Sequence, residues 1–246
     1  MTLQAWCQTD VGLRRDNNQD SFLIDEALGL FLVADGMGGH RGGEVASKLA
    51  VETVRDVVRQ ALQESGARRP NAREVLAKAY ETACAAIYDK SLEKEADLHG
   101  MGTTLVAALM IGDTLFIGNV GDSRAYLFTQ SQLWQITEDH SLVNEQLRAG
   151  LLKESDVGKF AAKNVITRSV GFEREVQVDI VERQMQEGDI VLICSDGLSG
   201  MVEDKRIVEI CKENPPKDVV SKCIDEAKQN GGDDNVTTLV IYAKGQ

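Results

Sequence analysis

The sequence predicts an α+β protein in which helices pack outside antiparallel β-sheets. Short apolar and alternating segments typical of strands recur along the 246 residues, and tight turns such as Gly112-Asp113 join several of them. Two long stretches with apolar residues spaced three and four apart predict amphipathic helices, and two shorter ones precede the last strand. Strands and helices in this order are typical of helix layers packed on sheets.

The first half of the chain supplies strands and then a pair of helices. Leu3–Thr9 is expected to be a strand, and Ser21–Asp25 with Leu30–Ala34 is expected to form a hairpin. A helix begins near Gly43, and a loop through Pro70 leads to the second helix. The apolar residues of each helix lie on one face, so we expect these faces to belong to the core.

The second half of the chain is expected to contain most of the strands. In order they are Thr103–Ile111, Thr114–Val120, Arg124–Phe128, Leu133–Ile136, Val176–Val181, Ile190–Cys194 and Val236–Tyr242. Between residues 138 and 171 the apolar periodicity weakens, which predicts a surface excursion, here called the flap. Asp204 is expected to cap a helix, and Pro216 to lie in the first turn of the next. Without a linker or repeat, residues 1–246 are expected to form a single domain.

The composition argues against several classes of function. The net charge of −12 disfavours non-specific binding to nucleic acid or to an anionic membrane surface, and no apolar run is long enough to span a bilayer. The five cysteines form no CxxC pair, which favours free thiols in a reducing compartment. We expect a monomer in the cytoplasm, with no nucleic-acid or membrane partner.

Aspartates stand at the ends of the predicted buried strands. Asp35 directly follows one strand, and Asp122 and Asp196 each stand two residues after another. Asp234 instead stands two residues before the last strand. If this last strand is antiparallel to the strands before Asp35 and Asp196, all of these carboxylates meet at one edge of the sheets. Clustered carboxylates repel one another unless a cation neutralises them, and oxygen ligands suit Mg²⁺ or Mn²⁺. The pattern therefore predicts a metal site.

Five short blocks, spread from residue 15 to residue 235, carry a family resemblance. They are Arg15-x-x-Asn18-Gln19-Asp20, Asp35-Gly36-Met37-Gly38-Gly39-His40, Gly102-Thr103-Thr104 with Gly121-Asp122-Ser123-Arg124, Ser195-Asp196-Gly197, and Gly232-x-Asp234-Asn235. In this order they resemble the metal-dependent protein phosphatases (type 2C serine/threonine phosphatases), in the variant of the bacterial branch that includes cyanobacterial and mycobacterial members. The resemblance implies a four-layered α-β-β-α sandwich, with two antiparallel sheets flanked by helix pairs and a mobile flap beside the active site.

The resemblance also implies which residues bind metal. Asp35 would bridge two Mg²⁺ or Mn²⁺ ions, and the carbonyl of Gly36 would complete the coordination of one of them. Asp196 and Asp234 would hold the other ion. Asp122, together with Asp196, matches the position that binds a third, weaker ion in bacterial members.

Four further residues are expected to act around these ligands. Arg15 matches the catalytic residue that binds the substrate phosphate, for which a guanidinium provides a suitable fork of donors. Gln19, Asp20 and Asn235 are expected to support the metal ligands through hydrogen bonds. Gln19 stands where many members carry Glu, so this site has one negative charge fewer.

The histidines and the remaining arginines are harder to assign. Met37 occupies the position of the general-acid histidine of the eukaryotic branch. His40 lies three residues further on, and both a proton-donor role and a structural role remain open for it. His140 is expected to order the start of the flap, Arg124 to be a sheet residue, and Arg14 to be solvated.

The function implied by the resemblance is hydrolysis of phosphoserine and phosphothreonine monoesters by a metal-activated water at a binuclear centre. Phosphorylated proteins and a cognate Ser/Thr kinase would be its partners. Two alternatives stay open: a hydrolase of small phosphoesters or nucleotides with the same metal centre, and an inactive binding module. A cysteine-dependent phosphatase is disfavoured, because no cysteine has an arginine six residues after it.

Overall fold

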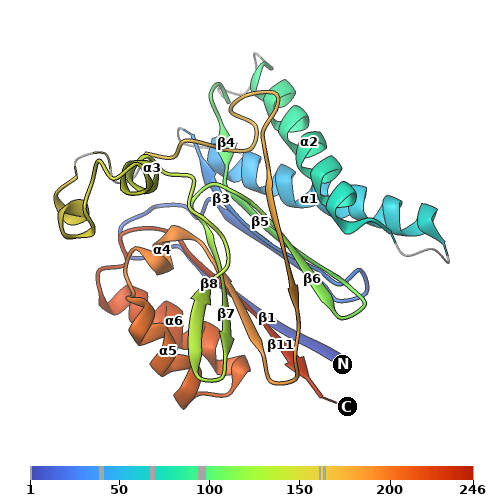
Figure 1. Ribbon diagram of the computed structural model, residues 1–246. Helices are drawn as coiled ribbons and strands as arrows, with labels where there is room; N and C mark the ends of the chain where they lie inside the picture. The colour runs from blue at the N-terminus through green and yellow to red at the C-terminus, as the bar shows by residue number, and fades with distance from the viewer. Residues whose placement is uncertain are drawn as a thin grey trace.

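The computed structural model describes residues 2–38, 42–66, 70–93, 98–160, 162 and 165–245. Two antiparallel β-sheets lie face to face, and helices cover both outer faces (Figure 1). The layers therefore run helix, sheet, sheet, helix. This confirms the four-layered sandwich that the family resemblance implied.

The first sheet contains five strands in the spatial order β1-β11-β10-β7-β8. Their bounds are β1 Thr2–Asp10, β7 Arg124–Thr129, β8 Gln132–Gln135, β10 Ile190–Cys194 and β11 Val236–Lys244. The last strand, β11, pairs antiparallel with both β1 and β10. Its start therefore lies at the same edge as the end of β10, which is the arrangement that brings Asp234 toward Asp196.

The second sheet follows the order β2-β3-β5-β6-β9, and a short β4 pairs with β3. The bounds are β2 Asp20–Asp25, β3 Leu30–Met37, β4 Gly102–Thr103, β5 Leu105–Ile111, β6 Thr114–Val120 and β9 Asp179–Gln184. The prediction for β9 was wrong by three residues. Val176 and Val178 pack against the core beneath the helices, and pairing with β6 begins only at Asp179.

Two pairs of helices form the outer layers. The second sheet is covered by α1 (Gly42–Ser65) and α2 (Ala72–Ser91), and the first by α5 (Asp204–Glu213) and α6 (Pro216–Gln229) (Figure 1). The N-cap of α5 is Glu203 rather than the predicted Asp204. Asp204 instead lies in the first turn, where a negative charge stabilises the positive end of the helix. No helix in the described parts of the chain is both long and apolar enough to cross a bilayer.

Three shorter helices complete the fold. The flap contains α3 (Leu142–Arg148) and a 3₁₀ helix at Glu154–Lys159. A single turn of helix, α4 (Asp196–Ser199), begins at one of the predicted metal ligands. The sequence analysis did not anticipate α4, because four residues are too few to show a helical period.

Alternate residues of β3 face two different cores. Phe31 and Val33 lie in the cluster between the sheets, where they join Ile193 of β10. Leu30 and Leu32 point the other way, into the cluster beneath α1 and α2. Successive side chains of a strand point to opposite faces, so a strand buried on both faces is apolar throughout. This explains why the strands that end near the aspartates are continuous apolar runs.

Tyr80 fixes α2 to the second sheet. Its buried hydroxyl donates to the carbonyl of Gly118 at 2.8 Å, with the carbonyl of Leu105 at 3.0 Å. A Cβ on Gly118 would come within 2.9 Å of the tyrosine ring. The missing side chain at Gly118 therefore makes room for the ring.

Replacing Tyr80 by Phe is expected to lower the free energy of unfolding by about 1–2 kcal/mol, because a buried hydroxyl donor is lost. Urea unfolding followed by circular dichroism measures the change. Tyr242→Phe is the matched control, since Tyr242 is only half-buried on β11, and it should stay within about 0.5 kcal/mol of the wild type. Equal losses in the two variants would contradict the assigned role of the hydroxyl.

Candidate metal centre

The aspartates expected to bind metal lie around one cleft. It has a volume of about 500 Å³ and opens where β3 and β10 end and β11 begins. Its lining consists of Arg15, Asn17, Gln19, Asp35, Gly36, Met37, Gly38, Ile166, Asp196, Asp234 and Asn235. Most of the site residues expected from the sequence are thus brought together, although they come from both sheets.

Asp35 and Asp196 are in direct contact. The two carboxyls lie within hydrogen-bonding reach of each other, which favours a shared proton: the interaction raises the pKa of Asp35 and lowers that of Asp196. Burial raises the pKa of Asp35 well above its ordinary value, and the charges of Asp20 and Asp196 raise it further. Burial, followed by the charge of Asp234, raises the pKa of Asp196. These carboxyls hold protons more strongly than free aspartate does, which is the behaviour expected of crowded anions.

Asp20 joins the two sheets at this site. From β2 it accepts hydrogen bonds from Ser195 Oγ, directly after β10, at 2.8 Å and from Thr237 Oγ1 of β11 at 2.6 Å, so it reaches the opposite sheet. Burial outweighs these hydrogen bonds and raises the pKa of Asp20 to about 6. The geometry fits the supporting role expected for Asp20. The part played by Thr237 was missed, although hydroxyls at Thr237 and Thr238 in an otherwise apolar strand are a usable signal.

The loop that carries Arg15 is fixed by Asn235. The side chain of Asn235 accepts a hydrogen bond from the backbone N–H of Gln19 at 2.7 Å. It also donates to the backbone carbonyls of Asn17, at 2.9 Å, and Val11, at 3.0 Å. Arg15 in turn donates from Nη2 to Asp234 Oδ2 at 2.6 Å. The two side chains are 51% and 35% exposed, so this ion pair lies at the rim of the cleft.

Two threonines fix the backbone of Asp35. Thr104 Oγ1 accepts from the Asp35 amide at 3.0 Å and contacts Ser123 Oγ at 2.7 Å. Thr103 Oγ1 donates to the Asp35 carbonyl at 2.8 Å. The Gly102-Thr103-Thr104 block therefore orients an aspartate of the cleft and does not line the cleft itself.

Gly36 packs against the start of α1 with no room for a side chain. A Cβ on Gly36 would lie 2.0 Å from the carbonyl oxygen of Gly43, and one on Gly43 would lie 2.6 Å from the carbonyl oxygen of Gly36. Only glycine permits such a close approach of two backbones. The contact fixes the peptide whose carbonyl is the expected metal ligand.

Asp122 stands beside the cleft rather than in its lining. Burial and the charge of Asp196 raise its pKa to about 7. The amide of Gly121 donates to Nδ1 of the buried His140 at 3.1 Å, and Nε2 of the same ring lies 2.9 Å from Asp179 Oδ2 and 3.2 Å from Arg168 Nη1. His140 thus connects the Asp122 loop to β9, in agreement with the structural role expected for it.

The carboxylates gather at the cleft without surrounding a common point. In the described part of the chain, no group of three or more Asp, Glu, His or Cys side chains has the spacing of metal ligands. Asp234 bonds to Arg15, and Asp35 lies against Asp196.

Two observations nevertheless fit a hard cation at this site. Burial and then charge repulsion raise the pKa of Asp35 and Asp196, and a cation would favour the charged form of both carboxylates. In addition, Oδ1 of Asp196 is buried and has no hydrogen-bond partner among the described residues. The oxygen atoms of the lining belong to carboxylates, amides and backbone carbonyls, which suit Mg²⁺ and Mn²⁺.

Two other expectations, and one residue that was not expected, complete the description of the site. Arg124 forms a bidentate ion pair with Asp139, with a shortest distance of 2.7 Å, as expected for a structural residue. His40 lies outside the described residues, so its role stays a prediction. Ile166 of the flap lines the cleft and was missed, because an isolated apolar residue in a polar segment gives no periodic signal.

Comparisons with known proteins identify the family. The family model described as protein phosphatase 2C matches residues 13–216. The chain belongs to the protein phosphatase 2C family. A curated member, the serine/threonine phosphatase stp of Listeria monocytogenes serotype 4b, is 40% identical over 246 residues, covering 97% of this chain and 95% of that protein.

Solved structures of the protein phosphatase 2C family share the fold. The crystal structure of the Mycobacterium tuberculosis serine/threonine phosphatase PstP/Ppp superposes with a TM-score of 0.89 at 33% identity and covers 100% of both chains. The catalytic domain of PstP in complex with two manganese ions gives a TM-score of 0.86 at 34% identity, covering 99% of each chain.

Replacing Asp122 by Asn is expected to stabilise the EDTA-treated protein at pH 8 but not at pH 4. The pKa of Asp122 is raised from 3.8 to about 7 by folding, so the wild type loses stability as the pH rises between these values. Asn does not titrate and avoids this loss. Scanning calorimetry should show a gain in Tm of about 2–4 °C per kcal/mol recovered at pH 8.

The control for this prediction is Asp225→Asn on the exposed side of α6. It also removes one negative charge, but from an exposed carboxylate and not from a buried one. The Tm of this variant should therefore equal that of the wild type at both pH values. A gain for Asp122→Asn that is the same at pH 4 and pH 8 would show that the ionisation of the buried Asp122 carboxyl is not its cause.

Proposed function

We propose that this protein is a serine/threonine phosphatase that hydrolyses phosphoserine and phosphothreonine monoesters in proteins. The observation that carries the proposal is the convergence of Asp35, Asp196 and Asp234 on one cleft with Arg15 at its rim. Support comes from the relatives in the protein phosphatase 2C family, which are named serine/threonine phosphatases, and from the two manganese ions in PstP.

The residues of the cleft would hold two Mn²⁺ or Mg²⁺ ions. Asp35 would bridge them, the carbonyl of Gly36 would complete the coordination of one, and Asp196 and Asp234 would hold the other. Asp122 with Asp196 would bind a third, weaker ion. When bound, the two core ions supply Lewis-acid chemistry: they lower the pKa of a water molecule and offset charge on the phosphoryl oxygens.

The side chains of the protein position the substrate and the ligands. Arg15 has five N–H donors, of which the Nη2 group is bonded to Asp234, so the remaining donors can bind the phosphate oxygens of a substrate. Asp20 and Asn235 hold the ligand-bearing segments through the hydrogen bonds described above, and Gln19 contributes a neutral amide to the lining. His40 is the candidate proton donor to the leaving hydroxyl.

The remaining parts of the proposal concern the oligomeric state, the domain, the cellular location and the partner kinase. We propose a monomeric protein with a single catalytic domain over residues 1–246, a cytoplasmic location and a cognate Ser/Thr kinase whose products it dephosphorylates. All five cysteines are free thiols and four of them are buried, which supports a reducing compartment.

Phosphate release from phosphoserine, phosphothreonine and phosphotyrosine peptides, each with Mn²⁺, Mg²⁺ or EDTA, tests the proposed function. The expected result is metal-dependent release from phosphoserine and phosphothreonine that EDTA abolishes. Activity on nucleotides alone would favour the small-phosphoester alternative. No activity on any substrate, with metal bound, would favour the binding module.

Replacing Asp35, Asp196 or Asp234 by Asn is expected to lower kcat/KM by at least about 100-fold, because each variant loses a charged oxygen ligand. Isothermal calorimetry should show weaker Mn²⁺ binding by each variant, while circular dichroism should show an unchanged fold. Asp233→Asn is the matched control, because Asp233 is exposed and adjacent to Asp234. Wild-type activity in any of the three variants would remove that residue from the centre.

Replacing Arg15 by Ala is expected to raise KM for phosphopeptides by about tenfold with a smaller fall in kcat, because a charge-assisted contact to the substrate phosphate is lost. Steady-state kinetics with a phosphothreonine peptide separate the two constants. Arg14→Ala is the control, since Arg14 is exposed and approaches only Asp233, at 3.8 Å, in the described structure. A large fall in kcat at unchanged KM would place Arg15 in transition-state stabilisation instead.

A further inference from the structure

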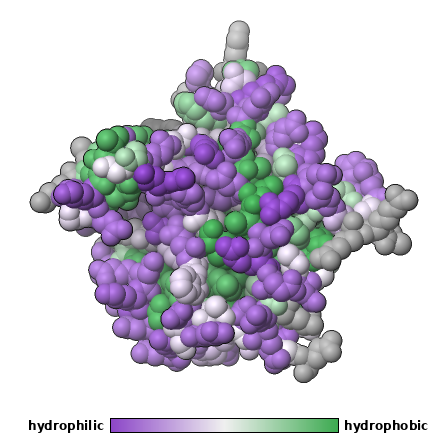
Figure 2. All heavy atoms as spheres, viewed as in Figure 1, coloured by the Kyte–Doolittle hydropathy of each residue, from purple (hydrophilic) through white to green (hydrophobic). Residues whose placement is uncertain are grey.

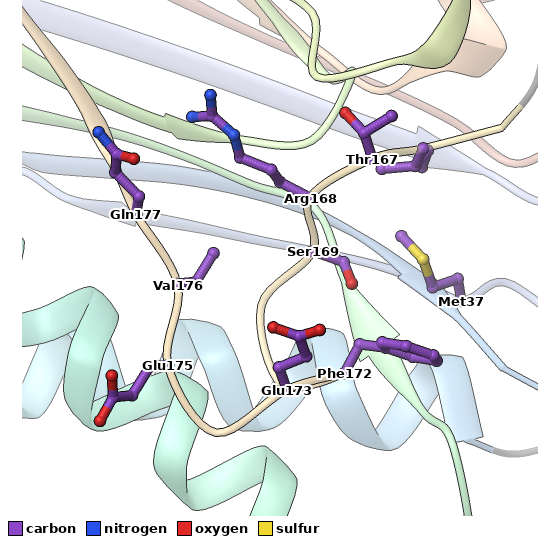
Figure 3. Close-up of a pocket in the computed structure, with 10 residues that line it drawn as sticks. Met37, Thr167, Arg168, Ser169, Phe172, Glu173, Glu175, Val176 and Gln177 are labelled. Atoms are coloured by element: carbon purple, nitrogen blue, oxygen red, sulfur yellow. The ribbon is translucent and has the colours of Figure 1, made fainter.

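A second cavity adjoins the candidate metal centre. Its volume is about 500 Å³, and it lies between the end of β3 and the segment that leads from the flap to β9 (Figure 3). It is lined by Met37, Ile166, Thr167, Arg168, Ser169, Phe172, Glu173, Glu175, Val176 and Gln177. Met37 and Ile166 also line the metal cleft, so the two hollows share a wall.

The walls of this cavity combine one apolar side with an acidic one. Phe172 is 61% exposed and lies on the same side of the cavity as Met37 (Figure 3). The carboxylate of Glu173 points into the cavity between Ser169 and Val176 (Figure 3). Figure 2 shows apolar side chains reaching the surface in a band across the middle of the molecule. An aromatic side chain left this exposed is available to a ligand.

The net charge of the cavity is negative. Its one cation, Arg168, is neutralised by Asp179, with Nη1 3.2 Å from Oδ1. Glu173 and Glu175 form no ion pair with any residue in the described part of the chain. Their neighbour Arg174 contacts Asp89 of α2 instead, at 3.4 Å. Glu173 therefore faces the cavity without a positive partner, while the carboxylate of Glu175 points away from it toward the helices (Figure 3).

The segment that carries these residues is fixed to its surroundings. Val170 exchanges backbone hydrogen bonds of 2.8 and 3.0 Å with Thr103 of β4. Gly171 has a φ of +91° and packs so closely on Ile87 that a Cβ would lie 2.1 Å from it. The thiol of Cys84 donates to the carbonyl of Glu173 at 3.0 Å. The positions of Phe172 and Glu173 are thus set by α2 and β4, and a fixed pocket binds with less loss of conformational entropy.

We propose that this cavity binds a side chain of the substrate protein close to the phosphorylated residue, and that it selects Lys or Arg. The inference rests on the proposed function. A cationic side chain would place its charge beside Glu173 and its methylene stem against Phe172, since long basic side chains bury their stems on apolar surface. Because the cavity shares a wall with the metal cleft, a residue within a few positions of the phosphorylated one reaches it.

Phosphothreonine peptides test the proposal. Arg, Ala or Glu is placed in turn at each of the four positions before and after the phosphothreonine, and kcat/KM is measured with Mn²⁺ for the wild type and Glu173→Gln. At one or two positions the wild type should prefer Arg over Ala by about fivefold, the size expected of a partly desolvated ion pair. Glu173→Gln should lose that preference while its kcat/KM for the Ala peptide changes less than twofold.

Two further variants separate charge from packing. Phe172→Ala should lower kcat/KM for the Arg peptide through weaker contact with the stem, and should do so equally for a Lys peptide. Glu213→Gln removes the same charge from the exposed surface of α5, on the other sheet, and should leave the preference intact. If Glu213→Gln weakened the preference as much as Glu173→Gln does, the overall charge would explain it and the cavity would not.

An unchanged ranking of peptides in Glu173→Gln, with full activity, overturns this inference and leaves the proposed function standing. The same holds if the wild type shows no preference at any position. If neither the peptides nor a small aryl phosphate were hydrolysed with Mn²⁺ by the wild type, the proposed function itself would fail. The two failures are therefore distinguishable in one set of measurements.

Discussion

The mutual repulsion of carboxylates at one edge of the sandwich is the constraint around which the site is built. Asp20, Asp35 and Asp196 are crowded at one edge of the two sheets, and burial, together with the charges of neighbouring carboxylates, raises their pKa values. The surrounding groups limit the cost of this crowding: hydroxyls bond to Asp20, and Arg15 bonds to Asp234. A cation would offset the remaining repulsion between the carboxylates, so the folded arrangement favours binding a cation.

Much of this arrangement could be predicted from the sequence, because it depends on local signals. The continuous apolar runs identified strands buried on both faces, and the aspartates at their ends pointed to a shared edge once β11 was taken as antiparallel. The family resemblance supplied the layers, and it supplied the roles of Arg15 and Gly36 as expectations. Errors arose where tertiary packing overrides a local pattern, as at Val176, which looks like a strand residue but packs on the helix-side core.

The parts that could not be predicted are contacts between segments distant in sequence. Nothing in a linear pattern shows that Thr237 bonds to Asp20, or that the Asp122 loop is connected to β9 through His140. The cavity beside the metal cleft is of the same kind, because its two walls are 130 residues apart along the chain at Met37 and Thr167. A sequence can place residues on elements, but the spaces between elements follow from their packing.

The hydrogen bonds of Asp20 have a mechanical consequence. They cross from one sheet to the other at the very edge where the candidate metal ligands meet, while the apolar contacts between the sheets lie further inside. The candidate metal centre therefore joins the two sheets at the edge of the sandwich that the inner apolar core does not cover. A displacement of one sheet relative to the other would separate Asp20 from Ser195 and Asp35 from Asp196 before the apolar contacts of the inner core were lost. Activity would then fail ahead of the fold, and it would report on the docking of the sheets more sensitively than any measure of secondary structure.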